Sequence, residues 1–236
     1  MKIIAFSDIH GDLITVKEKC DVVVIAGDIM PLYIQSNMVD SYEWFKHVFL
    51  PYIEKLPCKH VILVAGNHDI WFDEKIWEKL FQFENAPNVP TVENILKDYK
   101  GKLIYLKDSG VELDGVKFWG SPWITNLPRW AFNLTKDQQK EKFQLIPKDT
   151  DVLVTHTPPF GEVGTVQQEC WNKGRNFGSE ALKEVLMEED CQIKVCISGH
   201  IHSGSNIELI NNTTCYNVSQ KDESYNIHRK PVVIEL

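Results

Sequence analysis

The chain has 236 residues, of which 43% are hydrophobic, and carries a formal net charge of −8 at pH 7. This length and composition are sufficient for a sizeable buried core in one or two domains. The excess of negative charge argues against a broad surface for duplex DNA, because affinity for the phosphate backbone comes mostly from Lys and Arg.

Other global features predict a cytoplasmic protein. No run of about 18 apolar residues could span a membrane, and the N-terminal stretch "MKIIAFSDIHGD" reaches Asp and His too early for a signal peptide. The six cysteines are scattered without a C-x-x-C pair, so reduced thiols are expected rather than disulfides or a thiolate zinc site.

Five short apolar runs predict strands that are buried on both faces. Each is rich in Val, Ile and Ala and ends in Asp, Asn or His, which is typical of an α/β sheet covered on both sides. The runs are "KIIAFSD" (2–8), "DVVVIAGD" (21–28), "HVILVAGN" (60–67), "DVLVTH" (151–156) and "IKVCISGH" (193–200).

Helices are predicted between some of these strands. The segment 36–56 has apolar residues near helical spacing, and the segment 178–190 reads as a helix with Ser179 as its N-cap. The apolar positions of the first helix are expected at Val39, Trp44, Val48, Tyr52 and Ile53.

Antiparallel strands are predicted in two further segments. The segment 101–121 has turn signals at Ser109-Gly110 and Asp114-Gly115, and 205–219 has one at Asn211-Asn212. The sheet structure is therefore mixed. Because no linker or repeat interrupts the chain, we predict a single domain over 1–236. The segment 121–135 is the best candidate for a long loop, and long ordered loops are often functional.

Potential metal ligands follow all five of the predicted buried strands. In open α/β sheets, ligand sites form at the carboxyl ends of the strands. Singly, such an Asp is more often a turn residue and such a His an ordinary residue, but five of the eight histidines cluster in these stretches. The candidate ligands are Asp8, His10, Asp28, Asn67, His156, His200 and His202.

Seven ligands are too many for one ion with an open position, but they suit two divalent ions that share a carboxylate. Such a pair can bind a phosphoryl group and lower the pKa of a bridging water. Its net positive charge would allow an acidic protein to hold a phosphate. His68 is left over to assist the leaving oxygen, and Asp69 could orient its imidazole.

Five short blocks of the sequence resemble, in the same order, the motif blocks of the calcineurin-like metallophosphoesterase family. They are "SDIHGD", "AGDIM", "GNHD", "THTPPFG" and "SGHIH". Among the members of this family, small single-domain metallophosphoesterase-domain phosphodiesterases are most similar. The resemblance implies a four-layer α/β/β/α sandwich of two mixed β-sheets. It also implies one metal at Asp8, His10 and His202, a second at Asn67, His156 and His200, and Asp28 as the bridge.

The family commonly uses manganese, iron, zinc, nickel or magnesium, and manganese is favoured here. The predicted function is hydrolysis of small phosphodiesters by a metal-bridging hydroxide, with His68 and Asp69 as the catalytic side chains. A phosphomonoesterase or protein phosphatase is the alternative, and a nuclease or a non-catalytic scaffold is disfavoured. Trp123 and Arg175 are weak substrate-binding candidates, because core packing and solvation explain them equally well.

Overall fold

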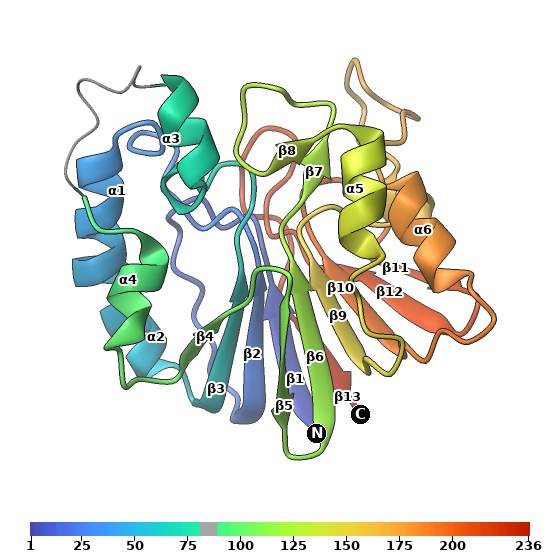
Figure 1. Cartoon of the computed structure of the whole chain (residues 1–236), viewed down its shortest axis with the longest axis horizontal. Coiled ribbons are helices and arrows are strands. Elements are labelled where there is room, and N and C mark those ends of the chain that lie inside the picture. Colours follow the sequence, from blue (N-terminus) through green and yellow to red (C-terminus); the bar gives the residue numbers. More distant parts are fainter. Residues whose placement is uncertain (81–88) are drawn as a thin grey trace.

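The computed structural model describes residues 1–80 and 89–236, and two mixed sheets form its centre (Figure 1). The first sheet has the strand order β13-β1-β2-β3-β4. Neighbours from β1 to β4 are parallel, whereas β13 is antiparallel to β1. The strands are β1 Lys2–Phe6, β2 Cys20–Ala26, β3 Cys58–Val64, β4 Leu103–Tyr105 and β13 Val232–Glu235.

The second sheet has the order β11-β12-β10-β9-β6-β5, with antiparallel pairs only at its two edges. Its strands are β5 Ser109–Leu113, β6 Val116–Ser121, β9 Val152–Thr155, β10 Val195–Ser198, β11 Ile207–Ile210 and β12 Thr213–Asn217. A small separate sheet pairs β7 Ile124–Thr125 with β8 Asn133–Leu134 inside the segment predicted as a long loop.

Helices cover the outer face of each sheet, which completes the predicted four-layer α/β/β/α sandwich (Figure 1). The first sheet is covered by α1 Met38–Trp44, the π-helix η1 Phe45–Phe49, α2 Leu50–Lys55, α3 Glu74–Leu80 and α4 Val92–Lys97. The second sheet is covered by α5 Lys136–Phe143 and α6 Glu180–Leu186. The chain also contains two short 3-10 helices, η2 Ile70–Phe72 and η3 Glu162–Gly164. Ser179 caps α6 as predicted, accepting a hydrogen bond from the Leu182 N–H.

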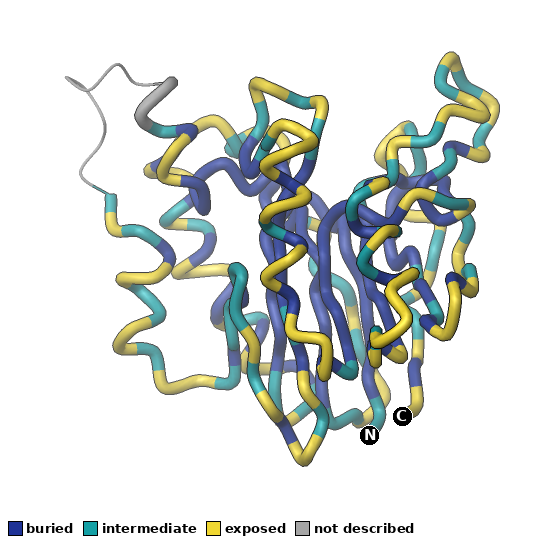
Figure 2. Tube along the Cα trace, turned by 45° about the vertical axis from the view of Figure 1, so that its right-hand side comes forward, coloured by how far each residue is buried: buried dark blue, intermediate teal, exposed yellow. Residues whose placement is uncertain are grey.

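Three apolar clusters fill the spaces between the four layers. The cluster between the sheets includes Val24, Ile62, Phe118, Val154 and Ile197, all buried. The central strands are therefore covered on both faces, as their continuous apolar runs predicted, and Figure 2 shows the buried trace running through both sheets. This rigid double layer carries the loops at the carboxyl ends of the strands.

The apolar face predicted for the first helical segment is partly wrong. Val39 and Val48 are 44% and 41% exposed, whereas Phe45 and Phe49 are fully buried. The buried side chains recur every three or four residues, at Met38, Ser41, Phe45, Phe49, Ile53 and Leu56, which is helical spacing even though Phe45–Phe49 is a π-helix. Val39 and Val48 each lie one residue away from this buried stripe and therefore face outward.

The predicted meander over 101–121 is also only partly correct. Asp114-Gly115 does connect the antiparallel strands β5 and β6, and β11 and β12 form the other predicted hairpin. Ser109-Gly110, however, begins β5 instead of forming a turn. The chain crosses between the two sheets just before it, because β4 pairs in parallel with β3 of the first sheet.

The remaining global predictions concern membranes and thiols. Within residues 1–80 and 89–236, none of the helices has the length and apolar character required to cross a membrane. All six cysteines are free thiols.

Candidate metal centre

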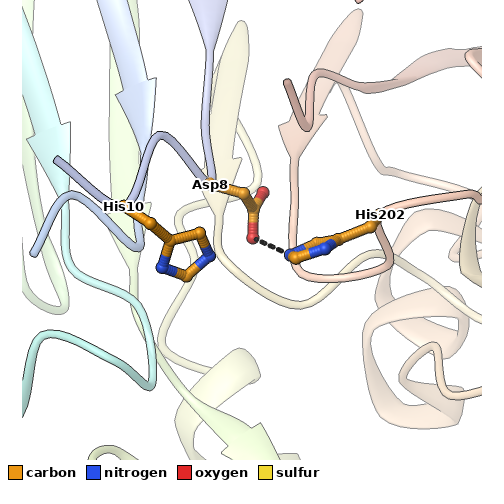
Figure 3. A group of neighbouring side chains, drawn as sticks. All are labelled: Asp8, His10 and His202. Atoms are coloured by element: carbon orange, nitrogen blue, oxygen red, sulfur yellow. Dashed lines mark ion pairs between the residues drawn. The ribbon is translucent and has the colours of Figure 1, made fainter. Parts of the chain in front are cut away.

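The carboxyl ends of five strands from both sheets meet at one edge of the sandwich. Because these strands point the same way, the residues that follow them lie together although they are far apart in sequence. Figure 3 shows the Asp8 carboxylate between the rings of His10 and His202. The structure thus brings together residues that follow β1 and β10, one strand from each sheet.

Three overlapping groups of side chains have the spacing of metal ligands. Within each group the ligand atoms all lie within 4.8 Å of one another, and Asp28 belongs to two of the three. The groups are Asp8, His10 and His202; His10, Asp28 and His68; and Asp8, Asp28 and His156.

The remaining two candidate ligands lie beside these groups. Asn67 Oδ1 is 3.0 Å from His156 Nε2, and the rings of His156 and His200 have centroids 4.9 Å apart. Asp28 Oδ2 lies 3.3 Å from His156 Nε2 and 4.0 Å from His10 Nε2. Asp28 is therefore central to the cluster, the position that a shared carboxylate requires.

The backbone leaves the extended conformation where it enters the site. Asp8, His10, Asp28 and His200 have φ values of 53°, 44°, 54° and 68°. Strand geometry therefore does not continue from Asp8 to His10. A left-handed backbone conformation at non-glycine residues costs free energy, and such residues concentrate at functional sites. Here this conformation turns the side chains of Asp8 and His10 into the cluster.

Glycines precede several ligands because a side chain would collide with the cluster. A Cβ atom at Gly66 would meet Asp28 Oδ1 and His156 Cε1, and one at Gly199 would meet the Asp8 carboxylate. The glycines in "AGN" and "SGH" thus permit the close approach of backbone to ligand.

Both carboxylates are buried and ionised. Burial by itself raises the pKa of Asp8, but the hydrogen bond and charge of His202 lower it overall. Burial likewise opposes ionisation of Asp28, and the charges of His156 and His68 lower its pKa well below the usual range. Asp8 also accepts hydrogen bonds from the Ser7 hydroxyl and the His200 N–H. The site therefore presents two negative charges to a cation.

Backbone carbonyls fix the ring orientation of two histidines. His156 Nδ1 lies 2.8 Å from the Ala26 carbonyl oxygen, and His202 Nδ1 lies 2.9 Å from that of Asp222. Each Nδ1 therefore donates its hydrogen to the carbonyl, which directs Nε2 into the cluster as ligating histidines require.

The charge states of these rings differ. Burial lowers the pKa of His10 to about 4 and, with the charge of His156, that of His200 to about 3. Burial would also lower the pKa of His156, but the Asp28 carboxylate raises it to about 9. The pKa of His202 is likewise raised, by its hydrogen bond to Asp8 against the effect of burial.

His10 supplies the test of whether these residues fit a metal. Both of its ring nitrogens are buried and have no hydrogen-bond partner in the described part of the protein. An unpaired buried nitrogen is costly, and Asp8 and Asp28 lie beside it in the two ligand groups that contain His10. Imidazole and carboxylate donors together fit a divalent transition metal.

We expect metal binding at pH 7 to release roughly one to two protons per chain, because His156 and His202 must be deprotonated to act as ligands. Isothermal titration calorimetry in two buffers of different ionisation enthalpy measures this release. The contribution of His156 should vanish above about pH 9, where its ring is already neutral. Binding without proton release at pH 7 would contradict this assignment of charge states.

The predicted pairing of Asp69 with His68 is wrong. The Asp69 carboxylate accepts four backbone hydrogen bonds, from Asp28, Ile29, Met30 and Gly66. The partner of His68 Nδ1 is instead Gln35 Oε1, at 2.5 Å. Asp69 thus holds together the loops that follow β2 and β3, and does not orient the imidazole.

Asp69→Asn should lower the free energy of unfolding by about 2–4 kcal/mol. The NH2 group of Asn would replace one of the accepting oxygens, so the backbone N–H groups that donate to that oxygen would be left buried and unpaired. The substitution should also reduce hydrolysis equally for good and poor leaving groups, because the loop carrying Asp28 shifts. Denaturant unfolding tests the stability, with the exposed Asp98→Asn as the matched control. A loss confined to poor leaving groups would restore Asp69 as the partner of His68.

A cavity of about 230 Å³ opens over the cluster. The sequence singled out four of its lining residues as ligands, and His68 as a catalytic side chain. It did not single out Leu127, Glu223 and Tyr225, which line the cavity together with Trp130. The segment 121–135, predicted as a long loop, provides Leu127 and Trp130.

The two weak substrate-binding candidates are not among the lining residues. Trp123 is buried, and its Nε1 donates to Asp108 Oδ1 at 2.8 Å. Arg175 lies over the exposed Trp171 ring and donates to Asn172. Core packing explains Trp123, and a surface contact explains Arg175.

Comparison with known proteins agrees with the geometry. Residues 1–204 match the model of the calcineurin-like phosphoesterase family. Metallophosphoesterase domain-containing protein 1 of Homo sapiens is 32% identical over 92% of this chain, which spans 64% of that protein's length. A UPF0046 protein of Caenorhabditis elegans is 31% identical over 99% of this chain and 74% of its own.

Solved structures share the fold at low identity. One crystal structure has a TM-score of 0.61 at 17% identity and covers 92% of this chain and 89% of its own. The Phosphopantetheinyl Hydrolase of Mycobacterium tuberculosis has a TM-score of 0.50 at 13% identity, covering 92% and 88%. Fold, ligand geometry and the sequence match agree: the chain belongs to the calcineurin-like phosphoesterase family.

Proposed function

We propose that the protein hydrolyses small phosphodiesters with two divalent metal ions, of which manganese is favoured. The observation that carries this proposal is the central place of Asp28, whose Oδ2 lies 3.3 Å from His156 Nε2 and 4.0 Å from His10 Nε2, between the two sets of candidate ligands. Family membership supports a metal-dependent phosphoric ester hydrolase.

The ligands divide into two sets around Asp28. Asp8, His10 and His202 would hold one ion. Asn67, His156 and His200 would hold the other, supported by the close approach of Asn67 and His156. Two such ions, when bound, would neutralise phosphate charge and activate a water for attack on phosphorus.

His68 is proposed to assist departure of the leaving oxygen. Its Nε2 lies 4.0 Å from Asp28 Oδ2, and the residue lines the cavity. From this position it can donate a hydrogen bond or a proton to the oxygen that leaves phosphorus. The ring of Trp130, 4.2 Å from that of His68 between centroids, forms the adjacent wall.

The charge of the cavity favours a diester over a monoester. Among the described residues that line it, none is Lys or Arg, and Glu223 adds a carboxylate at its wall. A monoester carries up to two negative charges at neutral pH, whereas a diester carries one and therefore needs less compensation. The aromatic side chains of Trp130 and Tyr225 can contact the second ester group.

We expect bis-p-nitrophenyl phosphate to be hydrolysed at least roughly tenfold faster than p-nitrophenyl phosphate after metal stripping and re-addition of manganese. The reason is the absence of a cationic side chain from the described cavity lining. Parallel initial rates with manganese, zinc, nickel, iron and magnesium provide the measurement. Preference for the monoester would favour a phosphatase, and no rate with any of these metals would refute the proposed activity.

A further inference from the structure

We infer that Gln35 is a positioning residue for His68: its side-chain oxygen fixes the imidazole as the Nδ1–H tautomer, so that Nε2 faces the reacting phosphate. This inference rests on the proposed function, since His68 assists the leaving group there. It assigns the orienting role to a neutral amide.

The contact between the two side chains determines which ring nitrogen carries hydrogen. Gln35 Oε1 lies 2.5 Å from His68 Nδ1. An amide oxygen can only accept a hydrogen bond, so Nδ1 must donate. In the neutral ring Nε2 is then without hydrogen, and this nitrogen lies on the side of Asp28.

Other contacts hold the ring in place but do not select the tautomer. The His10 ring packs edge-on against that of His68 at 4.7 Å, and the Trp130 ring packs against it at a tilt at 4.2 Å, both measured between ring centroids. The His68 backbone N–H donates to Asp28 Oδ1 at 2.7 Å. These contacts fix where the ring lies, whereas the hydrogen bond with Gln35 distinguishes its two nitrogens.

Gln35 is itself held by the loop that carries Asp28. Its backbone N–H and that of Ile34 both donate to the Pro31 carbonyl at 3.1 Å, which forms a tight turn. Met30, directly before this turn, donates to the Asp69 carboxylate. Asp69, which was expected to orient His68, thus anchors the loop that carries Gln35, the residue that contacts the His68 ring.

The selected tautomer fits the proposed proton transfer. Protonated His68 would give its Nε2 proton to the leaving oxygen as the bond from that oxygen to phosphorus breaks. The neutral ring that remains carries hydrogen on Nδ1, which is the form that Gln35 binds. In the opposite tautomer, the lone pair of His68 Nδ1 would face Gln35 Oε1, and the contact between these two acceptors would be repulsive.

Two variants of similar size separate this role from packing. Gln35→Met keeps the length of the side chain and removes the oxygen, whereas Gln35→Glu restores an acceptor. Two-bond ¹⁵N–¹H correlation spectra of the zinc-loaded protein report the tautomer of His68, whose signals are assigned with His68→Asn. Rates on methyl aryl phosphate diesters, with leaving groups from p-nitrophenol to phenol, give the second readout.

In the native chain and in Gln35→Glu we expect the Nδ1–H tautomer. In Gln35→Met we expect a mixture of tautomers, with a rate loss of roughly 10- to 100-fold for the phenol leaving group but under about threefold for p-nitrophenol. An unchanged tautomer in Gln35→Met, or an equal loss for both leaving groups, would overturn the inference.

Failure of the proposed function would look different. If the native chain shows no diester hydrolysis with any divalent metal, the proposed activity fails. The spectra still decide whether Gln35 sets the tautomer of His68, because they do not depend on turnover.

Discussion

Asp28→Ala should reduce metal-dependent diester hydrolysis by at least about 10³-fold and lower the number of bound metal ions. Asp28 Oδ2 lies beside His10 of one proposed ligand set and beside His156 of the other, so its removal affects both proposed ions. Stabilisation of transition-state charge is usually the largest catalytic contribution, and two-metal sites depend on the ligand that keeps both ions together. Steady-state rates and metal analysis of the purified variant measure the two effects.

Asp28→Asn separates charge from shape. It preserves the size of the side chain and can still accept the hydrogen bond from the His68 N–H, but it removes the negative charge beside His156. We expect it to resemble the alanine variant in metal content, and circular dichroism should show a retained fold. The exposed Asp149→Ala is the matched control. Full metal binding and activity in Asp28→Asn would refute the bridging role.

The strand ends could be predicted from sequence because the information is local. An apolar run followed by Gly and a polar residue identifies both the strand and the position where a ligand would lie. Parallel strands then place Asp28 and Asn67 at the same edge of the first sheet, whereas His156 follows β9 of the second sheet and reaches them only through the packing of the two sheets. The glycines in these blocks have a structural reason as well, since a side chain at Gly66 would collide with Asp28 and His156.

The partners of these residues could not be predicted in the same way. Gln35, 34 positions before Asp69 in sequence, occupies the place beside the His68 imidazole that was predicted for Asp69. Asp69 is adjacent to His68 in the chain, but its carboxylate turns towards the backbone of the loop after β2. Sequence proximity is a poor guide here because successive side chains in a tight turn point in different directions.

The cavity walls also depend on tertiary structure. Tyr225 lies far from the motif blocks in sequence and has a left-handed φ of 62°, but its ring lies 5.1 Å from those of both His10 and His202. Trp123 and Trp130 are seven residues apart in one segment, and only Trp130 lines the cavity. Aromatic composition alone could not distinguish the core residue from the site residue.

His68→Asn should lower the turnover number by about 10²–10⁴-fold for a diester with a poor leaving group, and much less for p-nitrophenol esters, because a good leaving group needs no proton. Metal content and KM should stay within about threefold of the native values, since the residue is proposed to act on the leaving oxygen and not to hold an ion. The exposed His47→Asn is the matched control, with rates measured across the same series of leaving groups.

The structure also defines the result that would overturn this role. His68 forms one of the three ligand groups with His10 and Asp28, so it is close enough to bind an ion itself. A His68→Asn protein that loses metal, and with it activity on every leaving group equally, would identify His68 as a ligand. Because Gln35 accepts from Nδ1 and leaves Nε2 free, the geometry permits either use of that nitrogen, and only the dependence on the leaving group distinguishes proton donation from metal binding.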